Sequence, residues 1–287
     1  MSLEVNKRLR IVVSGAGGLL GRTLVEHAPE SWEIIGLTRE DLDIGDSDSV
    51  DLAISKYKPD VVINCAAFTD VDGAESNPFG ALLVNEVGAR LLAFASNKYS
   101  AKLLHISTDF VFDGQKPTPY VESDTVNPLS VYGETKLSGE QAVAEICENF
   151  LIVRTAWLYG DYGRNFPDIM RGLAERGKIK VVTDQVGSPT YAPHLAKAIF
   201  SAVNADLCGI VHMSGSGACS RKDWATELFR VLKKDVQIDS ASSSDFPTPA
   251  KRPKQSALAS ERSEVKKLPN WESGVSDYCL ALTRSSK

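Results

Sequence analysis

The stretch RIVVSGAGGLLGRTLVEHA, residues 10–28, decides the fold. A short β-branched run, Arg10–Ser14, leads into glycines at positions 15, 18 and 21, and apolar residues at helical spacing follow. One such glycine makes a tight turn, one lets the backbone approach a pyrophosphate, and one lets the helix pack on the strand, with the helix N-terminus facing the anion. The stretch predicts a strand, a dinucleotide-binding turn and a helix; the alternative is a tight turn without a ligand.

Strand-like and helical segments alternate through the first half of the 287-residue chain. The predicted strands are Arg10–Ser14, Glu33–Leu37, Val61–Asn64, Lys102–Ser107 and Phe150–Arg154. The predicted helices between them are Gly18–His27, Ser47–Tyr57, Phe79–Tyr99 and Val131–Cys147. Repeated strand–helix units predict an α/β fold built on a Rossmann-like, doubly wound parallel sheet with helices on both faces.

The pattern changes after Gly160, where isolated short strands and polar loops join helices predicted at Asn165–Arg176, Pro193–Asn204 and Arg221–Lys233. We expect residues 1–160 to form a dinucleotide-binding Rossmann domain. Residues 161–287 should form mainly a smaller substrate-binding lobe, with some segments returning to the Rossmann core.

Composition excludes several classes of function. The net charge is −5 and no stripe of Lys and Arg is present, which argues against a nucleic-acid partner. Five scattered cysteines without a C-x-x-C pair argue against a disulfide framework or a zinc cluster, and a reduced cytoplasm fits them best. The apolar run before the glycines, Ile11–Val13, is too short for a signal peptide, and no later run approaches 18 residues, so no membrane segment is expected.

Two further elements carry chemistry. Strand Lys102–Ser107 runs into Ser107, Thr108 and Asp109, at the edge where parallel sheets bind ligands. Tyr132 and Lys136 stand four residues apart and share one face of a helix. We expect the ammonium to lower the pKa of the phenol and make it a proton donor near neutral pH. Taken alone, Ser-Thr-Asp after a strand is also ordinary for a turn, and a Tyr-x-x-x-Lys spacing also arises by chance. The order of both elements after a nucleotide-binding turn indicates an oxidoreductase.

The end of the second predicted strand bears on cofactor choice. An acid that binds the adenosine ribose is expected about 20 residues after the turn, but Thr38 and Arg39 occur there, and Glu40 and Asp41 follow. An Arg at this point suits a 2′-phosphate, so NADP(H) is preferred and NAD(H) is the alternative. Arg39 could equally be a solvated surface charge.

With these elements in place, the chain resembles the extended short-chain dehydrogenase/reductase superfamily and, within it, the dTDP-4-dehydrorhamnose reductase family. The resemblance covers nearly the whole chain and is carried by NCAAFTDVDGAE (64–75), VNEVGARLLA (84–93), STDFVFDG (107–114), YGETKLSGE (132–140), RTAWLYG (154–160), DQVGSPTYAPHLA (184–196) and RPKQSAL (252–258). It implies reduction of the 4-keto group of dTDP-4-dehydro-L-rhamnose to dTDP-L-rhamnose, with a nucleotide-sugar substrate and a homodimer as the assembly.

The resemblance also implies a set of site residues. The catalytic residues would be Thr108, Tyr132 and Lys136. The residues expected at the cofactor are Gly15, Gly18, Leu19, Leu20, Gly21, Arg39, Asp43, Ile44, Ala66, Ala67, Tyr132 and Lys136. Those expected at the substrate are Thr69, Val71, Thr108, Asp109, Phe110, Trp157 and Arg252, with Trp157 offering a flat face to a base or sugar. No metal site is expected, because none of His27, His105, His194 and His212 shows ligand spacing, and all four are interpreted as structural or surface residues.

Three positions depart from the family pattern. Phe110 replaces a usual Tyr, Leu19 stands where Gln is common, and Gln255 replaces Asn. These departures leave the chemistry intact but put the identity of the sugar in doubt.

Alternatives remain at this stage. A sugar-nucleotide 4,6-dehydratase usually has Glu after Thr-Asp, where this chain has Phe110. Another nucleotide-sugar reductase or an epimerase is possible by spacing alone. The regulatory beta subunit of methionine adenosyltransferase, which binds NADP without catalysing the reduction, is also similar.

Overall fold

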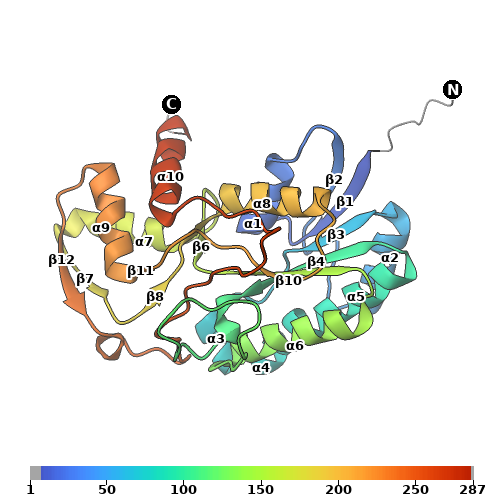
Figure 1. Cartoon of the computed structure of the whole chain (residues 1–287), viewed down its shortest axis with the longest axis horizontal. Coiled ribbons are helices and arrows are strands. Elements are labelled where there is room, and N and C mark those ends of the chain that lie inside the picture. The colour runs from blue at the N-terminus through green and yellow to red at the C-terminus, as the bar shows by residue number, and fades with distance from the viewer. Residues whose placement is uncertain (1–7, 286–287) are drawn as a thin grey trace.

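A computed structural model describes residues 8–285, and in that range six strands form one parallel sheet (Figure 1). Their order across the sheet is β10-β5-β4-β3-β1-β2. The strands are β1 (Leu9–Ser14), β2 (Trp32–Leu37), β3 (Val61–Asn64), β4 (Lys102–Thr108), β5 (Phe150–Thr155) and β10 (Gly209–His212). The five predicted strands are therefore confirmed to within one residue at each end. The strand order reverses between β1 and β3, and such a switch point opens a ligand crevice at the carboxyl edge.

Alternating side chains explain why helices cover both faces of the sheet. On β1, Ile11 and Val13 face a core formed with α1 (Leu19–Glu26) and α8 (Ala192–Asn204). Val12 faces the opposite core, which is completed by α2 (Ser47–Tyr57), α5 (Gly88–Lys98) and α6 (Val131–Ile146). Figure 1 shows α1 and α8 above the sheet and α5 and α6 below it. Both faces are buried, so the strands read as continuous apolar runs.

The long helical stretch after β3 is continuous from Pro78 to Lys98. It consists of α4 (Pro78–Leu82), a π-helical turn η1 (Leu83–Val87) and α5. By length and composition alone this stretch could cross a membrane. Its buried residues instead pack on the sheet and on α6, as expected for a core helix of a globular domain.

A second lobe has its own core around Trp224, Tyr159 and Tyr278. Its helices are α7 (Phe166–Leu173), η3 (Ala174–Arg176), α9 (Arg221–Leu232), η4 (Ser243–Asp245) and α10 (Trp271–Ser285). Its strands pair as β6 (Leu158–Tyr159) with β9 (Thr190–Tyr191), β7 (Lys178–Val182) with β12 (Gln237–Ala241), and β8 (Val186–Gly187) with β11 (Cys219–Ser220). Three helices of the second half match the predicted ones, whereas α10 was not predicted.

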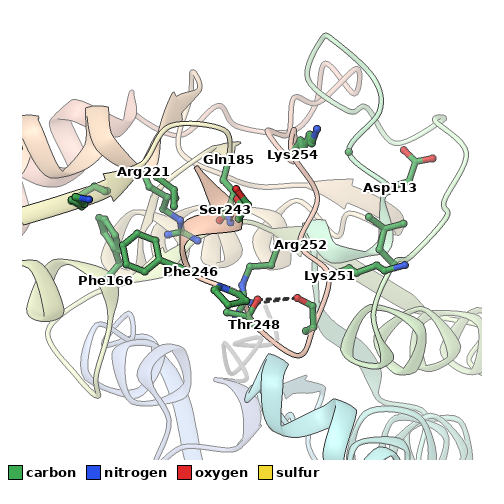
Figure 2. A pocket seen from close by; sticks show the side chains of 18 of the residues that line it. Asp113, Phe166, Gln185, Arg221, Ser243, Phe246, Thr248, Lys251, Arg252 and Lys254 are labelled. Carbon is green, nitrogen blue, oxygen red and sulfur yellow. Dashed lines mark hydrogen bonds between the residues drawn. The ribbon is translucent and has the colours of Figure 1, made fainter. Parts of the chain in front are cut away.

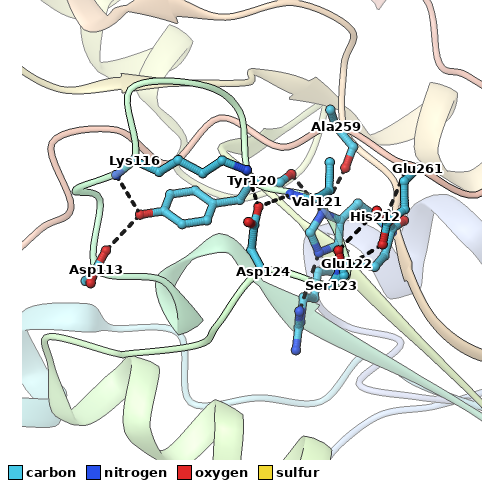
Figure 3. A network of polar contacts seen from close by, with 11 residues as sticks. Asp113, Lys116, Tyr120, Val121, Glu122, Ser123, Asp124, His212, Ala259 and Glu261 are labelled. Carbon is cyan, nitrogen blue, oxygen red and sulfur yellow. Dashed lines mark hydrogen bonds and ion pairs between the residues drawn. The ribbon is translucent and has the colours of Figure 1, made fainter.

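Segments from beyond residue 160 lie on the sheet. Helix α8 packs on α1, and β10 extends the sheet next to β5. The loop after β4 is also tied to a C-terminal segment, because Tyr120 N–H donates to Ala257 O at 2.8 Å and Ala259 N–H donates to Tyr120 O at 2.8 Å. Figure 3 shows this loop, where Glu122 Oε1 accepts the N–H of His212 at 2.7 Å. A domain boundary near residue 160 stays a prediction.

Candidate active site

One cavity of about 910 Å³ lies at the carboxyl edge of the sheet. Every site residue predicted from the sequence lines it: Gly15, Gly18, Leu19, Leu20, Gly21, Arg39, Asp43, Ile44, Ala66, Ala67, Thr69, Val71, Thr108, Asp109, Phe110, Tyr132, Lys136, Trp157 and Arg252. Segments more than 200 residues apart in sequence, such as those of Gly15 and Arg252, meet at this cavity. The parallel strands explain much of this, because they end at the same edge of the sheet. The structure brings the predicted residues together, and their individual roles stay predictions.

Two glycines of the turn are required because other parts of the protein backbone lie very close to them. Gly15 has φ of +68°, and a Cβ there would lie 2.6 Å from the backbone nitrogen of Ala66. A Cβ on Gly21 would lie 2.3 Å from the carbonyl oxygen of Gly15. Helix α1 begins after Gly18, which offers no side-chain cap, so its first N–H groups remain available to an anion. Turn and helix therefore fit a pyrophosphate.

The end of β2 suits a phosphorylated ribose. Thr38 donates from its backbone N–H and its hydroxyl to Asp41 Oδ2, at 3.0 and 2.8 Å. These bonds hold the pKa of Asp41 below its ordinary value and occupy the carboxylate that could otherwise bind a ribose hydroxyl. Arg39 is exposed and lines the cavity, where its guanidinium can meet a 2′-phosphate.

Tyr132 stands in the first turn of α6, where Ser130 Oγ caps the helix by accepting the N–H of Gly133. Its ring packs edge-on against Phe110, with centroids 5.4 Å apart. Phe110 thus supports the ring from the position where the family usually has Tyr.

The prediction that Lys136 acidifies Tyr132 is wrong. Burial raises the pKa of the phenol to about 12, the nearby Thr108 hydroxyl opposes that rise, and the charge of Asp109 adds to it. The ammonium is not among the groups acting on the phenol in the described part of the chain. Lys136 Nζ instead donates to the carbonyl oxygen of Ile106 at 2.7 Å. The two residues share a helix face, but the lysine side chain reaches toward the backbone of β4.

The pKa of Lys136 is lower than that of an ordinary lysine. Burial lowers its pKa to about 8, opposed by the charge of Glu140. Tyr132, with its raised pKa, is fully protonated at neutral pH.

Asp109 is the buried acid of the site. Burial raises its pKa to about 6, while the nearby Ser256 and Thr108 hydroxyls and the charge of Arg221 oppose the rise. Thr108 donates to Oδ1 at 3.1 Å. Its Oδ2 atom has no hydrogen-bond partner among the described residues. A buried unsatisfied carboxylate oxygen of this kind is costly and is typical of a binding site.

Trp157 has an unusual backbone and a covered ring. Its φ of +45° lies in the left-handed region, which a bulky residue rarely adopts. A Cβ on Gly187 would lie 2.3 Å from the indole, which explains the glycine of the DQVGSPT motif. The guanidinium carbon of Arg221 lies 3.5 Å from the ring centroid. Arg221 therefore covers one face that was expected to meet a base or sugar.

Arg221 is the main residue that sequence reasoning missed. It is the first residue of α9, and its guanidinium lies among the rings of Trp157, Phe166 and Trp224. No side-chain hydrogen bond or ion pair holds it within residues 8–285. The sequence around Arg221 carries no signal for this role, because two of the three aromatic partners, Trp157 and Phe166, come from distant segments.

Arg252, in contrast, is engaged. Its guanidinium donates to both carboxylate oxygens of Asp72, at 3.0 and 2.7 Å. Asp72 lies in α3 (Val71–Ser76), and this ion pair fastens the C-terminal loop to the mouth of the cavity.

A second cavity, of about 1100 Å³, adjoins the first. Arg221 and Arg252 line both cavities, and Lys180, Lys251 and Lys254 add positive charge to the second. Figure 2 shows the guanidinium of Arg221 directed into this space. The junction of the two cavities therefore favours an anion.

Among the described residues no group of three His, Cys, Asp or Glu side chains could hold a metal ion.

A Rossmann-like sheet, a glycine turn at its switch point and a Tyr–Lys pair in the same cavity define a nucleotide-dependent reductase of the short-chain dehydrogenase/reductase class. The chain belongs to the dTDP-4-dehydrorhamnose reductase family: the family model described as RmlD substrate binding domain matches residues 9–284.

Individual relatives agree with this assignment. The dTDP-4-dehydrorhamnose reductase of Sinorhizobium fredii is 38% identical, over 97% of this chain and 99% of its own. A dTDP-4-dehydrorhamnose reductase from Bacillus anthracis, solved in complex with NADP, superposes with a TM-score of 0.94 at 37% identity, covering 96% of this chain and 100% of that one. The dTDP-4-keto-6-deoxy-D-glucose reductase of Streptomyces niveus is 42% identical over 79% of this chain and 80% of its own.

Proposed function

We propose that this protein is an NADPH-dependent reductase that converts the 4-keto group of dTDP-4-dehydro-L-rhamnose to the alcohol of dTDP-L-rhamnose. The observation that carries the proposal is the single cavity shared by the glycine turn, Thr108, Tyr132 and Lys136. A bound dihydronicotinamide would supply the hydride to the C4 carbon of the sugar. Tyr132 gives its phenolic proton to the carbonyl oxygen, a contribution of about 10²- to 10⁴-fold for a positioned acid. Thr108 donates a hydrogen bond that strengthens as negative charge develops on that oxygen.

The other predicted residues have supporting roles in this proposal. The turn from Gly15 to Gly21 holds the pyrophosphate, and Ala66 and Ala67 approach the cofactor from the end of β3. Lys136 holds the nicotinamide ribose. Asp109, Thr69 and Val71 face the sugar side. The lobe built mainly from residues 161–287 binds the nucleotide part, and the active species is a cytoplasmic homodimer.

The direct test is absorbance at 340 nm with purified protein. NADPH should be oxidised only when dTDP-4-dehydro-L-rhamnose is added, and UDP- or GDP-linked ketosugars should give much lower kcat/KM. A relative that acts on a different dTDP sugar makes the 4-keto-6-deoxy-D-glucose nucleotide an informative second substrate. No oxidation with any ketosugar, together with capture of a methionine adenosyltransferase, would instead identify a regulatory subunit.

Arg39→Ala should reduce the preference for NADPH. Loss of a charge-assisted contact of about 1.5–3 kcal/mol corresponds to a rise of roughly 10-fold or more in KM for NADPH. KM for NADH should change little, because that cofactor lacks the 2′-phosphate. Steady-state kinetics with both cofactors provides the measurement, and Arg90→Ala, on α5 outside the cavity, is the matched control. Equal effects on both cofactors would assign Arg39 to the protein surface.

Arg221→Met should weaken binding of the sugar nucleotide more than turnover. We propose that its guanidinium, oriented by Trp157, binds the diphosphate at the junction of the two cavities. KM for the substrate and Kd for dTDP should both rise roughly 10-fold or more, while Kd for thymidine should be unchanged. Arg221→Lys should restore only part of the affinity, because a lysine keeps the charge without the planar stack. Arg230→Met, an exposed position of the same helix, is the control. Unchanged binding of dTDP would refute the assignment.

A further inference from the structure

A row of four buried polar side chains runs beneath the cavity, from the sheet to α6. Ser14 ends β1, Asn64 ends β3, His105 lies in β4 and Lys136 in α6, and each is at most 2% exposed. Ser14 Oγ donates to Asn64 Oδ1 at 2.7 Å. Asn64 Nδ2 lies 3.1 Å from His105 Nδ1, and His105 Nε2 lies 3.4 Å from Lys136 Nζ. These contacts connect three neighbouring strands, β1, β3 and β4, to Lys136.

The direction of the hydrogen bonds in this row can be deduced. The backbone N–H of Ala66 donates to Asn64 Oδ1 at 3.1 Å, and a backbone N–H can only donate. This contact fixes which amide atom of Asn64 is oxygen, so the amide nitrogen faces His105 Nδ1. Nδ1 must then accept, and the proton of the neutral imidazole must reside on Nε2.

The Nε2–H group consequently faces the amine of Lys136. A donor opposite an ammonium disfavours the charged form of the lysine. The ring is not expected to become an imidazolium, since burial and the neighbouring lysine charge hold the pKa of His105 well below its ordinary value.

Other groups around Nζ were considered. The carbonyl of Ile106 accepts from it, and the charge of Glu140 favours the ammonium although Glu140 is paired with Arg154. Burial raises the pKa of the Cys65 thiol to about 12, so Cys65 stays neutral. His105 is thus the neighbour whose orientation can tune the lysine.

We propose that His105, oriented by Asn64 and Ser14, is a positioning residue that holds Lys136 Nζ against the Ile106 carbonyl and favours the neutral amine of Lys136 over the ammonium. The sequence placed His105 among structural or surface histidines, and the row assigns it a specific task. With a pKa of about 8, Lys136 carries its proton below that pH and loses it above. If the proposed reductase function holds, activity should fall on the alkaline side of this value.

The first test needs no substrate. In protein labelled with ¹⁵N-histidine, the signal that disappears in His105→Phe identifies His105. We expect the neutral Nε2–H tautomer to persist from about pH 6 to about pH 9. An ordinary histidine would gain a proton near the lower end of this pH range. An Nδ1–H tautomer or a titrating imidazolium would overturn the proposal, whatever the enzyme reduces.

The second test reverses the direction of the hydrogen bonds on both sides of His105. In Asn64→Asp the carboxylate keeps the contacts with Ser14 and Ala66, but it accepts from His105 Nδ1, so Nε2 becomes an acceptor for Lys136. The ¹⁵N spectrum should switch to Nδ1–H, and the alkaline limb of the kcat/KM profile should move up by about one pH unit or more. The added charge acts in the same direction through space, so the double variant with His105→Phe should shift less than Asn64→Asp alone. Equal shifts in the single and the double variant would mean that the added charge, and not the histidine, determines the pH of the alkaline limb.

Two controls accompany these measurements. His194→Gln, on α8 where the ring pairs with Asp277, should leave the pH profile in place. If the Asp variant does not fold, the tautomer measured in the unmodified protein still decides the proposal.

Discussion

Replacing Tyr132 by phenylalanine lowers the turnover number by about 10²- to 10⁴-fold and leaves the affinity for NADPH nearly unchanged. The variant lacks only the hydroxyl that is proposed to donate the proton. The ring keeps its edge contact with Phe110, so the fold around the site should persist. Stopped-flow or steady-state oxidation of NADPH with the 4-keto sugar nucleotide measures turnover, and titration of intrinsic fluorescence measures cofactor binding.

The comparison variant is Tyr99→Phe, at the end of α5, where the hydroxyl donates to Asp51 at 3.1 Å away from the cavity. It undergoes the same chemical change and should keep full turnover. Turnover of Tyr132→Phe within a few-fold of the parent would mean that another group supplies the proton, and the buried carboxyl of Asp109 would be the next candidate.

Replacing Glu140 by glutamine destabilises the protein by about 3–5 kcal/mol, the range seen when one partner of a buried ion pair is removed. Glu140 and Arg154 are almost fully buried, and the guanidinium donates to both carboxylate oxygens, at 2.9 Å from Nε to Oε1 and 2.6 Å from Nη2 to Oε2. The hydroxyl of Ser107 also donates to the carboxylate. Loss of the negative charge leaves the Arg154 guanidinium uncompensated in the core. Urea unfolding followed by circular dichroism gives the free energy.

Glu145→Gln serves as the matched control, because Glu145 is an exposed residue of the same helix. It should change stability by about 0.5 kcal/mol or less. A loss below about 1 kcal/mol for Glu140→Gln would show that the interior rearranges or admits water, and that the pair contributes little to stability.

The corrected view of Tyr132 and Lys136 changes the reason for their pairing. Lys136 does not make the phenol a stronger acid in the protein without ligands, and the phenol stays protonated well above neutral pH. In the proposed reaction, stabilisation of the charge that develops on the carbonyl oxygen, by Thr108 among others, then contributes more than easy ionisation of the phenol.

Much of the fold could be predicted from local pattern. The β-branched run before Gly15 and the helical spacing after Gly18 are local signals, and the same alternation located every strand of the first half. Strand β10 was not predicted as part of the sheet, because Gly209–His212 is short and pairs with β5, about 58 residues earlier in the sequence. Helix α10 was missed, although its buried residues Trp271, Val275, Tyr278 and Cys279 follow helical spacing.

By itself, the sequence determined the class of the protein, the location of the glycine turn and the identity of the Tyr–Lys pair, because these depend on spacing within single strand–helix units. Only the tertiary structure decided that Lys136 points to Ile106, that Arg221 covers Trp157, and that Asn64 orients His105. Those relations depend on which side chains from distant segments become buried together. Burial sets their protonation and hydrogen bonding, and no local spacing encodes it.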